Sequence, residues 1–289
     1  MPEQEFPPLS ALEAAMEDLA CGREETAANA IESLARQGNV QAQAMLGYLL
    51  ERGQGLARDE GVARQWYELS AAAGEPSASY NLAVMLLEGR GGAADFRRAA
   101  ELCHVAAEAG VVEAQVLLAR LLSLGRGVRP DAAAARMWLE RAAQKGSAEA
   151  ELGLGILHDK GYGVPRDAAA AVEHYRRAAE GGSVAAQFNL ALALELGRGV
   201  ERDAEQARRW YHEAAERGFP QAQHNLAVML LEAPGAERDS ERAYVYASLA
   251  ANGGIEHATR LRDRIARELR LGELARARGS LEQWKPRSS

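Results

Sequence analysis

Cysteine is scarce in this chain, which has two cysteines among its 289 residues. Cys21 and Cys103 lie far apart in the sequence, and a disulfide between them is implausible at that separation. The sequence therefore contains no disulfide framework of the kind that holds small secreted domains together.

Long apolar segments are also lacking. No stretch is long and apolar enough to span a bilayer, so the sequence predicts no transmembrane helix. The segment Met1–Leu9 has neither a basic start nor an apolar core, so it predicts no signal peptide. The expected location is the cytoplasm, although a trimmed form of an exported protein would give the same pattern.

Positive charge is in short supply. The 34 Lys and Arg residues are outnumbered by 41 Asp and Glu, and the net charge of −7 argues against nucleic-acid binding by bulk charge. Residues 255–289 differ, because nine basic and five acidic side chains give them +4 and leave −11 for the rest. This basic end could contact an acidic partner or a membrane, but a solvated capping helix is the simpler expectation.

Motifs for chemistry are missing as well. The sequence has no Gly-x-Ser-x-Gly elbow, no His-Glu-x-x-His pair and no phosphate-binding loop. Its six histidines never fall at metal-binding spacing on one helix. We therefore expect no catalytic residue, no metal site and no bound cofactor.

What the sequence does have is a period. A glycine recurs every 36 residues without insertion or deletion, at Gly38, Gly74, Gly110, Gly146, Gly182, Gly218 and Gly254. Counted from this glycine, alanine stands at positions +4, +25 and +33, leucine at +8 and aspartate at +21 of successive units. This regularity indicates a tandem array of one small unit.

The apolar positions within each unit have helical spacing. Positions +4, +8, +11 and +12 share one helix face, and positions +25, +28, +32 and +33 share another. Glycines between them, such as Gly125 and Gly127, permit a tight turn, and the aspartate at +21 should cap the second helix. Each unit is predicted to be an antiparallel pair, helix A and helix B. Because one pair cannot bury its own apolar face, the pairs should stack into an all-α, right-handed solenoid with a 36-residue period.

These positions resemble a known repeat. The string Ala-x-x-x-Leu, then Gly-x-Gly-Val-x-x-Asp, then Trp-Tyr-x-x-Ala-Ala-x-x-Gly is similar to the Sel1-like repeat, a relative of the tetratricopeptide repeat. The best matches are 43–74 and 187–218. One exported branch of that family carries a cysteine pair in each repeat, so the absence of such pairs here speaks against an oxidising compartment.

The resemblance divides the chain into a repeat array and two caps. Six full repeats occupy 38–253, and we expect one domain over nearly the whole chain. Residues 1–37 should hold a partial repeat with two capping helices. Residues 254–289 should hold a long helix that ends near Gly272 and a short one that ends at Trp284.

A binding surface is also implied. In the tetratricopeptide fold helix A lines a concave groove, and the same geometry would place positions +3, +6, +7, +10 and +13 in it. The groove residues predicted in this way are Tyr48, Tyr80, Asn81, Val84, Arg120, Ile156, Phe188, Asn189, Leu192, His224, Asn225 and Val228.

Asparagines recur at position +7 of this groove. An amide offers a donor and an acceptor together, so these side chains could hold the backbone of an extended peptide. The alternative is that they bond a neighbouring helix and hold the stack together. Exposed apolar side chains favour a protein or peptide partner. Basic flanks on that partner would suit the nearby acids Glu51, Glu113, Glu149, Asp159 and Glu195.

Two further features concern rings. His158 and His174 lie in one repeat, at positions +12 and +28, where the other repeats have mostly apolar residues. They could form a polar pocket, a proton-sensitive point or a metal site. The alternative is that both histidines are hydrogen-bonded at the helix edges. Trp66, Trp138 and Trp210 recur at +28 and are predicted to fill the core between helices A and B.

The leading functional hypothesis is a non-catalytic, monomeric scaffold or adaptor that docks a partner segment in the groove. A narrower alternative, suggested by the resemblance, is an immunity-type neutraliser of a cognate bacterial effector. A third is a hydrolase-like activity, because weak β-lactam binding is associated with the cysteine-rich branch. The chain lacks both those cysteines and a nucleophile–base pair, which argues against the third.

Overall fold

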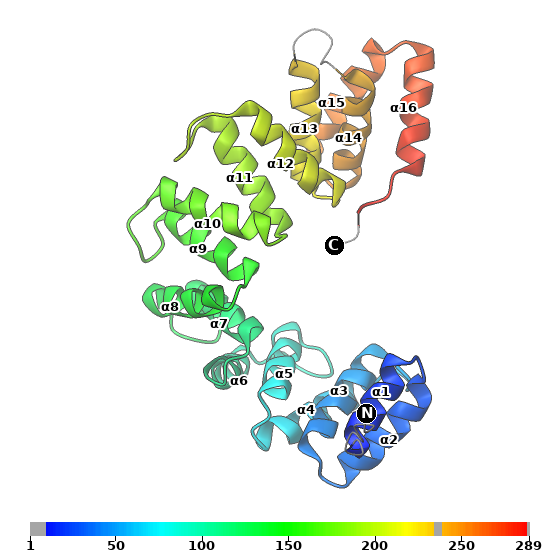
Figure 1. Cartoon of the computed structure of the whole chain (residues 1–289), viewed down its shortest axis with the longest axis vertical. Helices are drawn as coiled ribbons and strands as arrows, with labels where there is room; N and C mark the ends of the chain where they lie inside the picture. Colours follow the sequence, from blue (N-terminus) through cyan, green and yellow to red (C-terminus); the bar gives the residue numbers. More distant parts are fainter. Residues whose placement is uncertain (1–9, 234–238, 288–289) are drawn as a thin grey trace, which may run out of the picture. The chain divides into compact units, whose positions relative to one another are not determined.

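The structure is a computed structural model that describes residues 10–233 and 239–287. Regular secondary structure in these two ranges is entirely helical, and its sixteen helices pack mainly against their neighbours in the sequence (Figure 1). The predicted all-α class and the helical-repeat solenoid are confirmed. Within the same ranges, no helix is long and apolar enough to cross a membrane.

Contacts divide the chain into two compact units, and the boundary between them in the sequence lies between Ala142 and Ala143. The first unit contains α1 (Ala11–Ala20), α2 (Glu24–Arg36), α3 (Val40–Arg52), α4 (Glu60–Ala72), α5 (Pro76–Glu88), α6 (Phe96–Glu108), α7 (Val112–Leu124) and most of α8 (Ala132–Gln144). The second contains α9 (Ala148–Lys160), α10 (Ala168–Glu180), α11 (Val184–Leu196), α12 (Ala204–Glu216), α13 (Pro220–Glu232), α14 (Ser240–Asn252), α15 (Glu256–Glu268) and α16 (Leu271–Gln283).

The aspartate at position +21 begins every helix B of the six full repeats, as predicted. In each case its carboxylate accepts a hydrogen bond from the backbone N–H three residues later, which satisfies one of the free donors of the first turn. The six pairs lie 2.9–3.0 Å apart and join Asp59 to Val62, Asp95 to Arg98, Asp131 to Ala134, Asp167 to Ala170, Asp203 to Gln206, and Asp239 to Arg242.

The second glycine of the Gly-x-Gly turn contacts the preceding repeat. Gly91 has a φ of 67°, and a Cβ added to it would lie 2.3 Å from the carbonyl oxygen of Glu60, the first residue of α4. The turn after one helix A thus rests directly on the start of the previous helix B. The same close approach occurs at Gly55, Gly127 and Gly199.

Small side chains allow the helices to approach one another. The alanine at +4 of helix A, such as Ala78 and Ala186, is fully buried in all six full repeats, as predicted. The alanine at +25 of helix B is at most 2% exposed. The alanine at +33 is buried in three repeats and partly exposed in the other three, so its packing is less uniform.

Buried glutamines provide a link between consecutive repeats that the sequence did not reveal. Gln115 of α7 is 3% exposed, and its Nε2 donates to the carbonyl oxygen of Ala107 in α6 at 3.1 Å. Gln223 of α13 is 2% exposed and donates to Ala215 of α12 at 3.1 Å. Each amide therefore holds the end of one helix B against the next helix A.

The C-terminal cap differs from the prediction. The helix expected to reach Gly272 ends at Glu268, and the helix that follows is equally long. Leu269 is extended, with φ −72° and ψ 142°, and the Glu273 carboxylate accepts the Arg270 N–H at 2.8 Å. This side chain satisfies the start of α16, so Gly272 lies in its first turn instead of ending α15.

Candidate functional site

The twelve predicted groove residues all lie on A helices. Tyr48, Tyr80, Asn81, Val84 and Arg120 belong to α3, α5 and α7 of the first unit, and the other seven belong to α9, α11 and α13 of the second. None of the twelve is buried: Tyr48 is 40% exposed, Ile156 is 38% exposed, Arg120 is also exposed, and the rest are partly exposed. The positions taken over from the tetratricopeptide fold therefore lie at least partly at the surface, and their role in binding stays a prediction.

A polar chain crosses three helices beneath this surface in the second unit. The hydroxyl of Tyr211 in α12 donates to the Glu195 carboxylate of α11 at 2.7 Å and accepts from Nδ2 of Asn225 in α13 at 2.9 Å. Tyr211 is fully buried. Burial raises its pKa most, the hydrogen bond to Glu195 raises it further, and the hydrogen bond from Asn225 lowers it. The ring packs between helices while the hydroxyl ties two successive A helices to one helix B.

The first unit contains the same arrangement. The buried Tyr67 of α4 donates to Glu51 of α3 at 3.0 Å, and the side chain of Asn81 in α5 acts to lower the pKa of Tyr67. Arg90 then pairs with Glu51 at 2.6 Å. Burial, followed by the charge of Glu51, raises the pKa of Tyr67, so its hydroxyl stays protonated and acts as the donor.

A third set of residues has the same spacing, with Asp159 in place of the glutamate. Tyr175 is 7% exposed, and burial followed by the charge of Asp159 raises its pKa. Tyr175, Asp159, Asn189 and Arg198 line a hollow of about 40 Å³ together with Leu192. In the three copies the tyrosine follows the acid by 16 residues and precedes the asparagine by 14.

These bonds decide part of the question about the asparagines. Asn225 donates to a tyrosine of the previous repeat, as expected if the asparagines hold the stack together. Glu51 and Glu195, predicted to meet the basic flanks of a partner, accept hydrogen bonds from tyrosines within the protein. The fixed spacing of acid, tyrosine and asparagine in the sequence is the signal from which these contacts could have been predicted.

Comparison with known proteins identifies the repeat. The sequence model of the Sel1 repeat matches six consecutive segments, 40–75, 76–111, 112–147, 148–183, 184–219 and 220–255. The chain belongs to the Sel1 repeat family. Proteins of this family generally act as non-catalytic protein–protein interaction scaffolds.

Solved structures share the fold. A Sel1 repeat protein from Oxalobacter formigenes is 29% identical, with a TM-score of 0.78 over 84% of this chain and 97% of that one. The protective antigen c5321 of uropathogenic Escherichia coli, with an SLR fold, is 29% identical over 90% of this chain and 64% of its own length, with a TM-score of 0.57. The immunity protein PA5088 of Pseudomonas aeruginosa is 21% identical over 81% of this chain and 86% of that one, and its TM-score of 0.49 supports no functional argument. No curated protein sequence matches the chain.

Loss of one hydroxyl tests the polar chain between Sel1 repeats. We expect Tyr211→Phe to lower the free energy of unfolding by about 1 kcal/mol, because Asn225 and Glu195 lose their shared partner but remain close enough to water to be resolvated. Tyr162→Phe is the control, since Tyr162 is 59% exposed. Urea unfolding followed by circular dichroism measures both, and equal stability of the two variants would contradict a stabilising role.

His224, one of the predicted groove residues, also faces the C-terminal cap. Its ring lies 4.2 Å from that of His257 in α15, edge to face. Burial, followed by the charge of His257, lowers the pKa of His224 from 6.5. The folded state therefore favours the neutral imidazole of His224.

This shift gives the repeat array a pH dependence with a defined sign. The pKa of His224 is lower in the folded than in the unfolded state. Above about pH 6.5 the ring is neutral in both states, so its titration does not change the free energy of unfolding. As the pH falls below that value, the unfolded state binds the proton more readily, and the fold is destabilised. We expect His224→Gln to lose less unfolding free energy than wild type between pH 7.5 and pH 5.5. His257→Gln should have a smaller effect, because burial is the larger cause. A wild-type pH dependence retained by both variants would refute this assignment.

The two histidines of the fourth full repeat lie together. The rings of His158 and His174 stack with centroids 5.5 Å apart and planes 15° apart, and Nδ1 of His174 lies 2.6 Å from a Glu151 carboxylate oxygen. This is a local bond between the two helices of one repeat. In the described part of the chain, no group of three or more His, Cys, Asp or Glu side chains could hold a metal ion.

Proposed function

We propose that this Sel1 repeat protein is a non-catalytic scaffold that binds an apolar segment of a partner protein on the A-helix face of its second unit. We define that face by seven residues: Ile156, Phe188, Asn189, Leu192, His224, Asn225 and Val228. The corresponding first-unit residues, Tyr48, Tyr80, Asn81, Val84 and Arg120, form the equivalent face of that unit in this proposal.

Apolar exposure at one helical position carries the proposal. On α9 the core residue Leu154 is 4% exposed, whereas Ile156 is 38% exposed. On α11 and α13 the leucines at +8 are also buried, while Leu192 and Val228 at +10 stay partly exposed. Leu192 and Val228 pack against the core cluster but keep part of their surface exposed, and apolar surface that recurs on three successive A helices is typical of a partner-binding site.

An aromatic side chain on this face is fixed in place. Phe188 packs against Tyr211 with ring centroids 5.8 Å apart and against Phe219 at 5.3 Å. Tyr211 is in turn fixed by its bonds to Glu195 and Asn225. An aromatic ring that is already ordered loses little conformational entropy on binding, so the polar chain beneath the face would help binding by preorganisation.

The partner in this proposal is apolar with basic flanks. Glu149 at the start of α9 is exposed, and Glu195 and Asp159 are partly exposed, so the face is acidic where it meets solvent. A basic flank would bring its charge to these carboxylates, and binding should weaken as the salt concentration rises.

Affinity capture from the source organism tests the proposal. The bait is wild type, the double variant Ile156→Asp/Leu192→Asp, or the control Tyr162→Asp/Leu196→Asp, whose two residues are 59% and 54% exposed elsewhere in the unit. We expect a partner that is retained by wild type and the control and lost by the first variant, all three having the same helical signal. A partner retained equally by all three would place binding elsewhere.

A further inference from the structure

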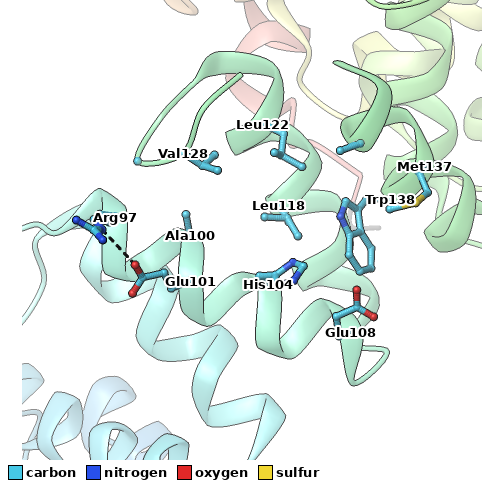
Figure 2. Close-up of a pocket in the computed structure, with 12 residues that line it drawn as sticks. Arg97, Ala100, Glu101, His104, Glu108, Leu118, Leu122, Val128, Met137 and Trp138 are labelled. Carbon is cyan, nitrogen blue, oxygen red and sulfur yellow. Dashed lines mark hydrogen bonds and ion pairs between the residues drawn. The ribbon is translucent and has the colours of Figure 1, made fainter. Parts of the chain in front are cut away.

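The first unit contains a pocket that is separate from the A-helix face. Its volume is about 510 Å³, and it lies between the B helices α6 and α8. Figure 2 shows Leu118 and Leu122 of α7 facing the same space as Val128 from the following turn and Trp138 of α8. Sequence reasoning placed Trp138 in the core, and it is 2% exposed, but it also lines this pocket.

The same place one repeat earlier is filled by charged side chains. Arg64 of α4 donates to the carbonyl oxygen of Ala93 at 3.1 Å and lies 3.4 Å from Glu68. Arg98 of α6 approaches Glu68 at 3.3 Å. The space between α4 and α6 is therefore occupied by one carboxylate and two guanidinium groups with their aliphatic stems.

Three substitutions empty the equivalent space between α6 and α8. Thirty-six residues after Arg64, Glu68 and Arg98 the chain has Ala100, His104 and Ala134. Ala100 and Ala134 end at Cβ, and all three residues line the pocket. The pocket thus arises from local side-chain replacement within an unbroken repeat.

Charged residues surround the mouth of this apolar pocket. Glu101 pairs with Arg97 at 3.2 Å, and Glu108 pairs with Arg141 at 3.6 Å, all four side chains being 45–85% exposed. Exposed pairs of this kind are weak and can exchange partners. Arg141 also lies 4.6 Å from the Trp138 ring centroid, which shows that this indole accepts a cation on its face.

We propose that this pocket is a second docking site, which takes a leucine or phenylalanine side chain from a partner protein segment that has lysine or arginine beside it. The apolar side chain lies against Ala100, Leu118 and Leu122, where the arginine of the preceding repeat would otherwise be. The adjacent basic residue pairs with Glu101 or Glu108 at the mouth. Glu101 and Glu108 are held only by exposed arginine pairs, so a cationic neighbour of the bound side chain can replace one of those arginines.

The fold itself supplies a variant that closes the pocket. Ala100→Arg places in α6 the residue that α4 has at the same position, and the combination Ala100→Arg/His104→Glu/Ala134→Arg reproduces the complete cluster of the preceding repeat. Val105→Arg is the control, because Val105 is 51% exposed on α6 and the added charge is the same. If the single pocket variant fails to fold, the triple variant replaces it.

The probes are two labelled ten-residue peptides with a central Leu-Phe pair, flanked by lysines in one and by glutamates in the other. Fluorescence polarisation should show the lysine peptide binding wild type about tenfold more tightly than the glutamate peptide, and the pocket variant about tenfold more weakly than wild type. Val105→Arg should stay within about twofold of wild type.

Several results would overturn the proposal. They are equal affinity of wild type and the pocket variant, tighter binding of the glutamate peptide, or no binding of the lysine peptide at its solubility limit. Ile156→Asp/Leu192→Asp separates this site from the A-helix face. If that variant loses the peptide and Ala100→Arg retains it, the peptide binds the A-helix face, and the second site is refuted without affecting the proposed function.

Discussion

Replacing Gly91 by alanine is expected to lower the free energy of unfolding by about 3 kcal/mol or more, whereas the same change at Gly74 costs about 1 kcal/mol. Both glycines have positive φ, 67° and 91° respectively, so both variants carry the strain of an L-residue in that region. They differ in their surroundings. A Cβ at Gly91 would lie 2.3 Å from the Glu60 carbonyl oxygen, and a Cβ at Gly74 would meet nothing within 4 Å.

The extra cost at Gly91 measures the contact between repeats. The atom that blocks the new methyl group is the backbone carbonyl oxygen of Glu60, at the start of α4. It cannot move without disturbing the first turn of that helix. Denaturant unfolding of the two variants and wild type gives both free energies under one condition. Equal costs at Gly91 and Gly74 would show that the turn does not rest on α4 as closely as described.

Changing Gln223 to glutamate is the second substitution with a large expected effect. Gln223 is 2% exposed, and its amide nitrogen donates to the Ala215 carbonyl oxygen, which also accepts the Gly218 N–H. A carboxylate there has no proton to donate and brings a negative charge to a carbonyl oxygen in a buried place. We expect a loss of about 3 kcal/mol at pH 7.

The pH dependence of this variant identifies the cause. Burial raises the folded-state pKa of the new carboxyl above its unfolded value of about 4.3. The cost is therefore complete above the folded pKa and disappears as the pH falls toward about 4, where the protonated acid can donate to Ala215. Gln221→Glu, on the exposed side of α13, is the control. A Gln223→Glu deficit that does not shrink on acidification would contradict the assigned bond.

Sequence periodicity predicted the repeat because its signals are local. The spacing of Asp59 from its glycine, repeated six times, determines where each helix B begins, and the structure places every such carboxylate on a first-turn N–H. The surface position of Ile156 was expected from the tetratricopeptide resemblance, and this side chain is 38% exposed. The end of α15 was missed because it depends on the Glu273 carboxylate that caps the next helix, and not on the conspicuous Gly272.

Bonds between repeats were harder to predict, because each joins residues on different helices. Tyr211 meets Glu195 and Asn225 only when α11, α12 and α13 have packed. The pocket beside Trp138 has a similar origin, since it results from a position where an arginine is replaced by Ala100. Averaging over repeats reveals the scaffold, whereas departures from the average, such as this one, are where individual sites arise.

Site-specific photo-crosslinking tests the proposed scaffold function most directly. A benzophenone amino acid replaces Ile156 on the A-helix face in one variant and Arg209 in another, Arg209 being 72% exposed at its side chain on helix B. Both variants are irradiated in lysate of the source organism, and the products are identified by mass spectrometry. We predict one protein partner crosslinked from position 156 and not from position 209. Equal crosslinking from both positions, or a partner joined only from position 209, would contradict the account.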